Sequence, residues 1–278
     1  MKTVLFEDII KKVKETCMTI GCRMDEGVFE KLKCAYGEET VPATKFALDI
    51  MLKNALIAKE TNSPLCQDTG MTVVFVKMGE VKIEGGFIGD AINEGVRQGY
   101  SEGYFRKSVL DPISRKNTLD NTPAVIHYEI TKGEELSINI MLKGFGSENM
   151  SRLFMLSPSE GIDGVKDAII KSVMVGGGNP CPPIIVGVGI GGTMEKAALM
   201  SKHSLLRDIN SINEDNILAG MEEELKEKIN ALNIGAQGFG GKNTALRVFI
   251  EKYPTHLAGL PVAVTIQCHA SRHGEIVF

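Results

Sequence analysis

The sequence predicts an α+β fold with a helical N-terminal lobe, about residues 1–60, followed by a lobe of mixed strands and helices, about residues 61–278. Apolar residues recur at helical spacing through the first lobe. Beyond it, short β-rich and helical segments follow one another without strict alternation, which favours a mixed α+β arrangement over a doubly wound parallel sheet. A chain of 278 residues with 43% apolar residues can bury a sizeable core, so we expect a single domain.

The first lobe is expected to hold helices over about residues 4–36 and 42–60. Between Ile9 and Ile20 the apolar side chains return about every 3.6 positions, as on one face of a helix. Asp25 is typical of an N-cap before the segment that follows it, and Pro42 is typical of a first helical turn.

The second lobe is expected to alternate irregularly between strands and helices. The segment Lys132-Gly133-Glu134 separates two β-rich runs and is typical of a hairpin turn. Thr193 is expected to cap a helix, and the highly charged helix near the C-terminal third is expected to be exposed. Strands are predicted over residues 71–78, 124–130, 136–142, 183–190 and 261–267, and helices over residues 92–105, 162–175, 193–207 and 216–231.

Composition excludes several classes of function. Charged residues make up 24% of the chain and the net charge is −4, which does not suggest binding to nucleic acid or to an anionic membrane. The sequence has no pattern of a signal peptide and no run of about 18 apolar residues. The default expectation is therefore a cytoplasmic protein.

The six cysteines fall into two groups. Cys17, Cys22 and Cys34 lie in the helical lobe, where free cysteine usually behaves as a small hydrophobic residue. The other three lie beside glycine, proline or asparagine in loops or at element ends: Cys66, Cys181 and Cys268. Thiolates are the soft ligands that iron–sulfur clusters require, and three of them would leave one iron open for chemistry. From the residues alone, buried loop cysteines are an equal alternative.

The segments around these cysteines resemble the class I (iron–sulfur) fumarate hydratases and the related L(+)-tartrate dehydratases. The resemblance extends over nearly the whole chain, and its motifs occur in the family's order. They are PLCQDTG (64–70), GYFRKSVLDP (103–112), KGFGSENMSRL (143–153), GGGNPCPPIIVGVGIGGTMEKAALMSKHSLLR (176–207), NIGAQGFGGKNTAL (233–246) and PTHLAGLPVAVTIQCHASR (254–272).

The resemblance implies that Cys66, Cys181 and Cys268 ligate a [4Fe-4S] cluster, whose fourth iron would bind the hydroxyl and carboxylate of the substrate. It also implies that this chain is the α subunit, the cluster-binding half of the family. A β subunit would complete the site and supply the catalytic base, a threonine, and αβ pairs would associate into dimers.

The resemblance further implies a set of residues that contact a small dicarboxylate substrate. Asp68 would transfer a proton, and Arg106 would hold a carboxylate. The remaining members would be Gln67, the backbone at Gly144 and Gly146, and His256. Phe145 departs from the expected KGGGSEN pattern, which puts a close backbone contact at this position in doubt.

Without the resemblance, ordinary structural roles for these residues are equally or more strongly favoured. Arg106 could be a surface arginine, Asp68 could cap the turn before Thr69, and His256 could be a structural histidine. The run from Gly187 to Gly192 matches the G-x-G-x-x-G pattern of dinucleotide-binding loops. A polar helix, and not a second strand ending in an acid, is predicted after it. We expect these glycines instead to let a loop pass close to the cluster or to a subunit interface.

The sequence thus favours a hydro-lyase that interconverts fumarate and (S)-malate, with its β subunit needed for full activity. The alternative is the α subunit of an L(+)-tartrate dehydratase, which would convert tartrate to oxaloacetate. A less favoured alternative is a non-catalytic iron–sulfur protein for redox or sensing.

Overall fold

The computed structural model describes residues 2–278, which form two compact units. Unit 1 contains the described residues up to Asp25, together with Asn54–Phe145 and Ser271–Phe278. Unit 2 contains Glu26–Lys53 and Gly146–Ala270. Helices dominate the N-terminal part, and each unit combines a sheet with helices, so the α+β prediction is confirmed. The expectation of one domain stays a prediction.

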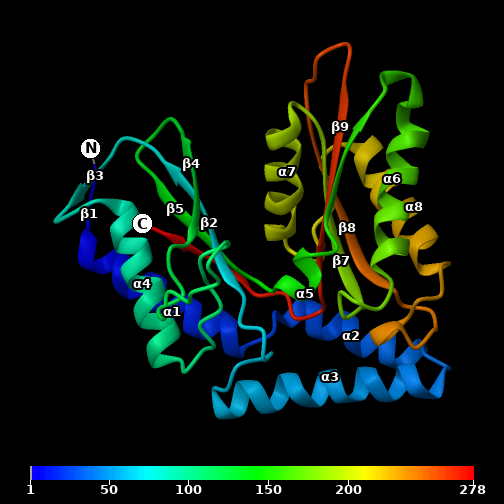
Figure 1. Ribbon diagram of the computed structural model, residues 1–278, viewed down its shortest axis with the longest axis horizontal. Coiled ribbons are helices and arrows are strands. Elements are labelled where there is room, and N and C mark those ends of the chain that lie inside the picture. The colour runs from blue at the N-terminus through cyan, green and yellow to red at the C-terminus, as the bar shows by residue number, and fades with distance from the viewer. Residues whose placement is uncertain (1) are drawn as a thin grey trace. The chain divides into compact units, whose positions relative to one another are not determined.

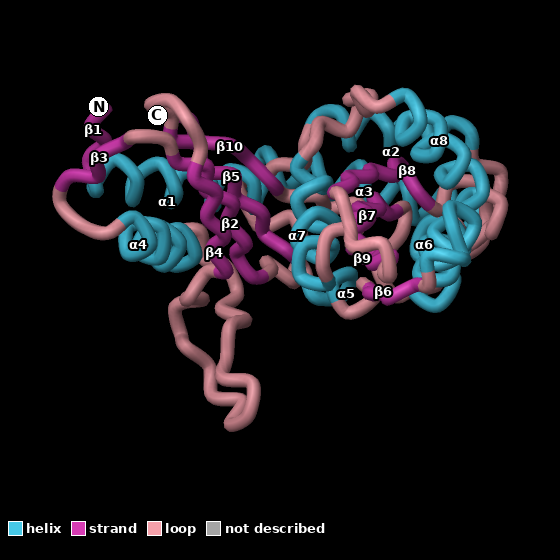
Figure 2. The backbone as a smooth tube through the Cα atoms, turned by 90° about the horizontal axis from the view of Figure 1, so that it is seen from above, coloured by secondary structure: helices cyan, strands magenta, loops and turns pink. Residues whose placement is uncertain are grey.

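Unit 1 is built on a four-stranded sheet with the strand order β10-β5-β2-β4, which is seen from two sides in Figures 1 and 2 and is labelled in full in Figure 2. These strands are β2 (Met71–Met78), β4 (Val125–Ile130), β5 (Leu136–Lys143) and β10 (His273–Val277). Strand β2 pairs in parallel with β4 and antiparallel with β5. The predicted hairpin between β4 and β5 is therefore wrong. Residues 72–76 of β2 are all buried, and this apolar strand takes the central place, whereas the more exposed β4 lies at an edge.

Helices α1 (Phe6–Cys22) and α4 (Ile88–Glu102) lie side by side against this sheet (Figures 1 and 2). Helix α1 starts a few residues later than predicted, and α4 starts a few residues earlier. Such differences are common at helix ends. Two short parallel strands, β1 (Lys2–Leu5) and β3 (Val81–Glu84), were not predicted. A long loop over residues 103–124 joins α4 to β4 and extends away from the sheet (Figure 2).

Unit 2 contains a second four-stranded sheet, with the order β6-β9-β7-β8. Its strands are β6 (Arg152–Leu156), β7 (Ile184–Gly191), β8 (Ala245–Tyr253) and β9 (Leu260–Gln267). Strand β7 runs parallel to β8 and antiparallel to β9. Helices α6 (Gly161–Gly176) and α8 (Asn216–Asn230) cover one face, and α7 (Met194–His203) covers the other (Figure 1).

The glycines of the G-x-G-x-x-G run explain how α7 packs. Gly187 and Gly189 lie inside β7 and not in a loop, so that expectation is wrong for these two positions. A Cβ atom added at Gly187 would lie 2.1 Å from the carbonyl oxygen of Ser201, and one at Gly189 would lie 2.1 Å from that of Ala197. Glycine is required here because the backbone of α7 approaches the strand so closely.

Helix α8 is charged but not fully exposed, which corrects the prediction. One face is buried and contributes Leu218, Met221, Leu225 and Ile229 to the core of unit 2. The same face carries Glu222, whose side chain is inaccessible. Its Oε1 accepts hydrogen bonds from Arg207 Nη1 (2.6 Å), Asn213 Nδ2 (2.8 Å) and the backbone N–H of Ile250 (2.9 Å). Glu222 thereby ties α8 to β8.

The remaining helices are α2 (Glu26–Glu38), α3 (Pro42–Thr61) and α5 (Phe145–Glu148), with short 3₁₀ turns at Pro158–Glu160, Ser204–Leu206 and Ala236–Gly238. Pro42 begins α3 as predicted, and Asp25 directly precedes α2. Thr193 stands at the N-cap position of α7, but its hydroxyl donates to the Glu195 carboxylate and does not cap the backbone. Over residues 2–278 no helix is long and apolar enough to cross a membrane.

Candidate functional site

Cys66 lies in unit 1, on the short loop between α3 and β2, and its side chain is exposed. The residue before it fixes the loop. Leu65 is buried, its backbone N–H donates to the carbonyl of Gly21 (2.9 Å), and its own carbonyl accepts from Asn54 Nδ2 (2.9 Å). The loop therefore presents the thiol to solvent from a firmly held backbone.

Asp68 anchors the other side of this loop. Its Oδ1 accepts the N–H of Gly70 (3.0 Å), and its Oδ2 accepts the N–H of Phe145 (2.7 Å). The contact with Gly70 agrees with the alternative interpretation, in which Asp68 caps the turn. The second contact goes further, because it joins the Cys66 loop to the end of β5.

Arg272, which was not predicted as a site residue, also holds this loop. It is 2% exposed, and its Nη1 donates to the carbonyl oxygen of Asp68 (2.7 Å). Tyr100 is also buried, and its hydroxyl donates toward the carbonyls of Thr69 (2.8 Å) and Gly70 (3.0 Å). Burial raises the pKa of Tyr100, so it remains a neutral donor.

The side chains of Gln67 and Arg106, two of the predicted substrate contacts, have no hydrogen-bond or ion-pair partner among residues 2–278. Gln67 is exposed, and within the described chain its side chain makes no hydrogen bond. Arg106 is also exposed, and no ion pair of its guanidinium occurs among residues 2–278. Its backbone is held close, since Thr69 Oγ1 donates to the Arg106 carbonyl (2.8 Å). Unit 1 therefore brings Cys66, Gln67, Asp68 and Arg106 to one loop cluster.

The Gly144–Gly146 segment follows β5 directly. A Cβ atom at Gly144 would lie 3.1 Å from Asp68 Oδ2 and 3.3 Å from Arg272 Nη2, so glycine lets the chain pass close to the Asp68 carboxylate. A Cβ at Gly146 would meet nothing within 4 Å. Phe145 is 47% exposed and uses its backbone N–H for Asp68, so the departure from glycine leaves this backbone contact in place.

Cys181 lies in unit 2, on the turn before β7, and is exposed. Its φ of 55° is in the left-handed region, which is uncommon for a residue with a side chain. The turn rests on the loop over residues 235–241, where the N–H of Gln237 donates to the carbonyl of Pro182 (2.9 Å). A Cβ at Gly238 would lie 2.9 Å from the Cα of Gly178, so the two loops touch through their backbones.

Cys268 directly follows β9, the strand beside β7, and is half-buried. Because β7 and β9 are antiparallel, the start of β7 and the end of β9 meet at one end of the sheet, with Ile185 opposite Gln267. His269 Nδ1 lies 3.0 Å from the carbonyl oxygen of Cys181. Unit 2 therefore brings the turns of Cys181 and Cys268 together.

Two of the remaining cysteines are buried and poorly suited as ligands. Cys17 is fully buried, and burial raises the pKa of its thiol to about 12. Cys22 is buried too, and its thiol donates to the carbonyl of Asn62 (3.2 Å). A thiol held protonated by burial is a poor nucleophile and a poor ligand. Cys34 is exposed on α2.

Within either unit taken singly, no three His, Cys, Asp or Glu side chains of residues 2–278 are grouped to hold a metal ion. The donor chemistry nevertheless fits an iron–sulfur group, since all three cysteines lie on loops that are held by hydrogen bonds, with Cys66 and Cys181 exposed and Cys268 half-buried. Two of the three come from unit 2 and one from unit 1.

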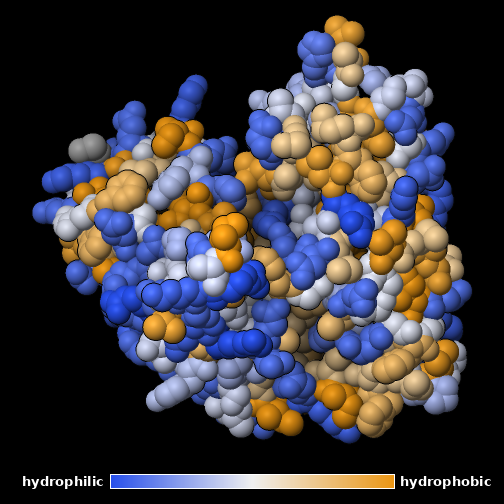
Figure 3. Space-filling view, in the orientation of Figure 1, coloured by the Kyte–Doolittle hydropathy of each residue, from blue (hydrophilic) through white to orange (hydrophobic). Residues whose placement is uncertain are grey.

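His256 is not near the cysteine turns of its own unit. It is exposed on the loop between β8 and β9, at the end of the sheet opposite Cys181 and Cys268 (Figure 1). Strand β9 alone separates these ends by about 23 Å at 3.3 Å per residue. Its Nδ1 accepts the N–H of Ala258 (3.2 Å). Figure 3 shows hydrophilic and hydrophobic residues mixed at this tip, where Leu257 is 87% exposed.

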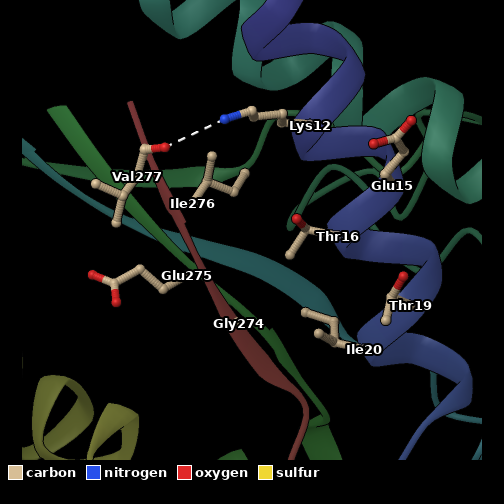
Figure 4. Close-up of a pocket in the computed structure, with 9 residues that line it drawn as sticks. All are labelled: Lys12, Glu15, Thr16, Thr19, Ile20, Gly274, Glu275, Ile276 and Val277. Carbon is tan, nitrogen blue, oxygen red and sulfur yellow. Dashed lines mark hydrogen bonds between the residues drawn. The ribbon is translucent and has the colours of Figure 1, made fainter.

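Two of the cavities that the described residues form have no cysteine in their linings. One of about 450 Å³ in unit 1 lies between α1 and β10, where Lys12 Nζ donates to the carbonyl of Val277 (3.3 Å) (Figure 4). It contains none of the predicted site residues. The other, of about 470 Å³ in unit 2, is mainly apolar and lies between α6, α8 and the β8–β9 loop, with His256 in its lining.

Sequence reasoning missed three residues that hold the cysteine loops: Arg272, Gln267 and His269. Each lies within four residues of Cys268 in the chain, so the motif itself contained the signal. Their burial and contacts depend on the packing of β9 and β10, which the sequence did not reveal.

Comparison with known proteins agrees with the resemblance. The family described as "Fumarate hydratase (Fumerase)" matches residues 10–277. A Methanocaldococcus jannaschii protein, named provisionally as an L(+)-tartrate dehydratase subunit alpha, is 43% identical over 256 residues, which cover 90% of each chain. The L(+)-tartrate dehydratase subunit alpha of Escherichia coli K12 is 32% identical over 262 residues, covering 93% of this chain and 86% of its own. That of Shigella sonnei shows the same identity and coverage.

The match spans nearly the whole of both units, including all three loop cysteines, and the predicted resemblance is confirmed. The chain belongs to the fumarate hydratase (Fumerase) family.

Proposed function

We propose that this chain is the α subunit of an iron–sulfur hydro-lyase that removes water from a hydroxydicarboxylate, with L(+)-tartrate as the leading substrate. The observation that carries the proposal is the similarity to chains named L(+)-tartrate dehydratase subunit alpha over 86–90% of their length. This preference reverses the order given by the sequence alone, which favoured fumarate.

Fumarate hydratase is the second candidate, and the family's own description supports it. The two reactions share their chemistry. A C–O bond to hydroxyl breaks, a proton leaves the neighbouring carbon, and a C=C bond forms with release of water. With tartrate the product is an enol that rearranges to oxaloacetate, whereas (S)-malate gives fumarate.

Cys66, Cys181 and Cys268 would hold a [4Fe-4S] cluster. When bound, such a cluster supplies an iron with an open position, which stabilises the departing hydroxyl as a Lewis acid. The cysteines suit this task because their loops are held by hydrogen bonds, while Cys66 and Cys181 are exposed and Cys268 is half-buried. The chain would carry the cluster as its resident cofactor.

The exposed guanidinium of Arg106 is the group proposed to bind a substrate carboxylate. Arginine offers paired N–H donors that match the two oxygens of a carboxylate. It has no competing carboxylate of its own within the described chain, so it remains available. Gln67, also without an internal partner, would orient the same substrate by hydrogen bonding.

Asp68 is proposed for proton transfer, and its contacts limit how it can act. Each of its oxygens already accepts one backbone N–H. A carboxylate is an acceptor group, so these backbone N–H bonds fix its orientation. The backbone of Gly144 and Gly146 would lie along the bound substrate on the β5 side of the loop.

A partner β subunit is proposed to complete the site, because the relatives are themselves named as α subunits. It would supply the base that removes the carbon-bound proton. The chain by itself should then turn over slowly or not at all, and addition of the β subunit should restore activity.

His256 would serve a different copy of the chain. It lies too far along β9 to reach the cysteine turns of its own unit 2, and it stands on an exposed tip with an apolar leucine beside it. We therefore propose that αβ pairs associate so that His256 of one α subunit enters the site of another. Each site would then be incomplete in an isolated pair.

Mixing two inactive variants tests this arrangement. His256→Ala keeps its cysteines, and Cys181→Ser keeps its histidine. If His256 acts in the second copy, unfolding and reassembling the two variants together should restore up to about a quarter of wild-type activity, since half of the dimers are mixed and each has one complete site. No gain over the separate variants would contradict the arrangement.

The cluster assignment is tested by comparing Cys181→Ser with Cys34→Ser, a matched change at the exposed cysteine of α2. After anaerobic reconstitution, the first variant should lose the brown absorbance and most of its iron, whereas the second should retain both. EPR of the oxidised wild type should show loss of one iron to a [3Fe-4S] form. A cluster that keeps four ligands and only cycles electrons would instead favour a redox or sensing protein.

The substrate is tested with the reconstituted αβ complex. Oxaloacetate formation from L(+)-tartrate supports the leading candidate, and interconversion of fumarate and (S)-malate at the higher kcat/KM supports the second. D-tartrate serves as the stereochemical control. A loaded complex that acts on none of these would overturn both.

A further inference from the structure

One buried side chain holds the turn of Cys268. Gln267 is the last residue of β9 and is 1% exposed. Its Nε2 lies 3.3 Å from the carbonyl oxygen of Cys268, 3.6 Å from Cys268 Sγ and 3.3 Å from the carbonyl oxygen of Ala270. A single amide nitrogen therefore faces three acceptors of the turn that follows it.

The orientation of this amide is fixed by its surroundings. An NH₂ group donates, whereas the reversed amide would set its oxygen against two carbonyl oxygens, which is unfavourable. The other end of the amide, Oε1, is buried and has no hydrogen-bond partner among residues 2–278. Leaving a buried amide oxygen unpaired is unfavourable in itself. A polar side chain at this place is thus costly for folding, and its benefit lies on the side of the cysteine.

The turn that Gln267 holds is also joined to the other cysteine of unit 2. Gln267 pairs with Ile185 at the start of β7, and Cys181 lies on the turn just before that strand. The ring of His269 contacts the Cys181 carbonyl at 3.0 Å. A change in the position of the Cys268 turn would therefore also displace the Cys181 turn.

We propose that Gln267 is a positioning residue that fixes the Cys268 sulfur for iron and donates an N–H to it when it is a thiolate. This inference rests on the proposed function, in which Cys268 is a cluster ligand. Hydrogen bonds to ligand sulfur orient the ligand and raise the reduction potential of an iron–sulfur cluster, because they stabilise its more negative form.

The test compares Gln267→Met, which keeps the length of the side chain and removes the amide, with Thr265→Val. Thr265 lies two residues earlier on the same buried strand, and its hydroxyl contacts Ser201 (2.7 Å) but nothing in the turn. The control therefore removes a buried polar contact of β9 while leaving the cysteine turn intact.

The first measurement is made on the anaerobically reconstituted αβ complex. Gln267→Met should lower the midpoint potential of the cluster, as measured by a redox titration monitored by EPR. The variant should also lose iron to a chelator several-fold faster than wild type. Thr265→Val should leave both unchanged. A fully loaded Gln267→Met variant with the wild-type potential and iron-loss rate would overturn the proposal.

The second measurement needs no cluster. In the metal-free chain, alkylation of Cys268 by iodoacetamide is measured by mass spectrometry relative to Cys34. Gln267→Met should raise this ratio several-fold, because the turn is no longer held, and an unchanged ratio would overturn the proposal. If the methionine variant does not fold, Gln267→Asn, whose amide is too short to reach the turn, carries the same expectation. A wild-type chain that takes up no cluster contradicts the proposed function, while the alkylation ratio still decides the role of Gln267.

Discussion

The Cys66 loop of unit 1 and the cysteine turns of unit 2 are held in different ways. The Cys66 loop is an irregular segment fixed by polar side chains, of which Tyr100 and Arg272 are buried, Asp68 is half-buried and Asn54 is exposed. The turns of Cys181 and Cys268 extend directly from neighbouring strands and depend on the position of β7 and β9. In both cases hydrogen bonds hold the backbone, while Cys66 and Cys181 are exposed and Cys268 is half-buried.

This difference indicates where each part is vulnerable. In unit 2, a substitution that disturbs the packing of strands and helices should shift β7 and β9 and thereby displace the cysteine turns. In unit 1, loss of one buried hydrogen-bond donor should loosen the Cys66 loop and leave the sheet in place. Two substitutions test the comparison, and a third, away from both cysteine regions, serves as a reference.

The largest effect is expected from Gly189→Ala. The new Cβ would lie 2.1 Å from the Ala197 carbonyl oxygen, so α7 must move away from β7. We expect a loss of about 3 kcal/mol or more in the free energy of unfolding, at the upper end of overpacking costs. Denaturant unfolding measures it, and hydrogen exchange should increase in the Cys181 and Cys268 turns. The matched control is Gly220→Ala in α8, where an added Cβ meets nothing within 4 Å. A stable Gly189→Ala variant would refute the close approach of α7.

A smaller and more local effect is expected from Arg272→Met. The change removes the donor to the Asp68 carbonyl inside a site where Arg272 is 2% exposed. Leaving a buried acceptor unpaired costs about 1–3 kcal/mol. Hydrogen exchange should rise at residues 66–70 and remain unchanged in unit 2. Arg23→Met, at an exposed position of unit 1, should change neither. An equal response in both units would remove the distinction between them.

The smallest effect is expected from Glu224→Gln, which touches neither cysteine region. Hydrogen bonds from Lys166 (2.6 Å) and Lys228 (2.8 Å) lower the pKa of Glu224 from 4.5 to about 2. Because the folded pKa is depressed, this stabilisation is fully present above about pH 4.5 and is lost as the pH falls toward 2. The Tm difference between wild type and variant should therefore shrink over this range. Glu227→Gln, at an exposed neighbouring position on α8, is the matched control, and a Tm difference for Glu224→Gln that stays constant over this range would contradict the prediction.

Much of the fold could be predicted from local pattern. Long periodic or continuous apolar segments gave β2, α3, α6 and β9 close to their actual bounds. Strand β8 was missed because Arg247 and Glu251 interrupt its apolar run, although the strand is mostly buried. The hairpin between β4 and β5 was wrong because strand order depends on burial of β2 on both faces, and turn residues do not report it.

The candidate site could be predicted only as a set of residue types. The motifs drew attention to the loop cysteines and to Asp68 and Arg106. They did not indicate that Asp68 is bonded to Phe145, because that contact joins residues 77 positions apart. They also placed His256 with the cysteines, whereas the strand register sets it at the opposite end of the sheet.

By itself, the sequence determined which family this chain belongs to and where most helices and strands lie. These follow from residue identity and local periodicity, which do not depend on distant contacts. Only the tertiary structure decided that Gln267 and Arg272 are buried against the cysteine loops and that Gly187 and Gly189 admit α7. Burial and close approach arise from packing between segments far apart in the chain, and no local pattern specifies them.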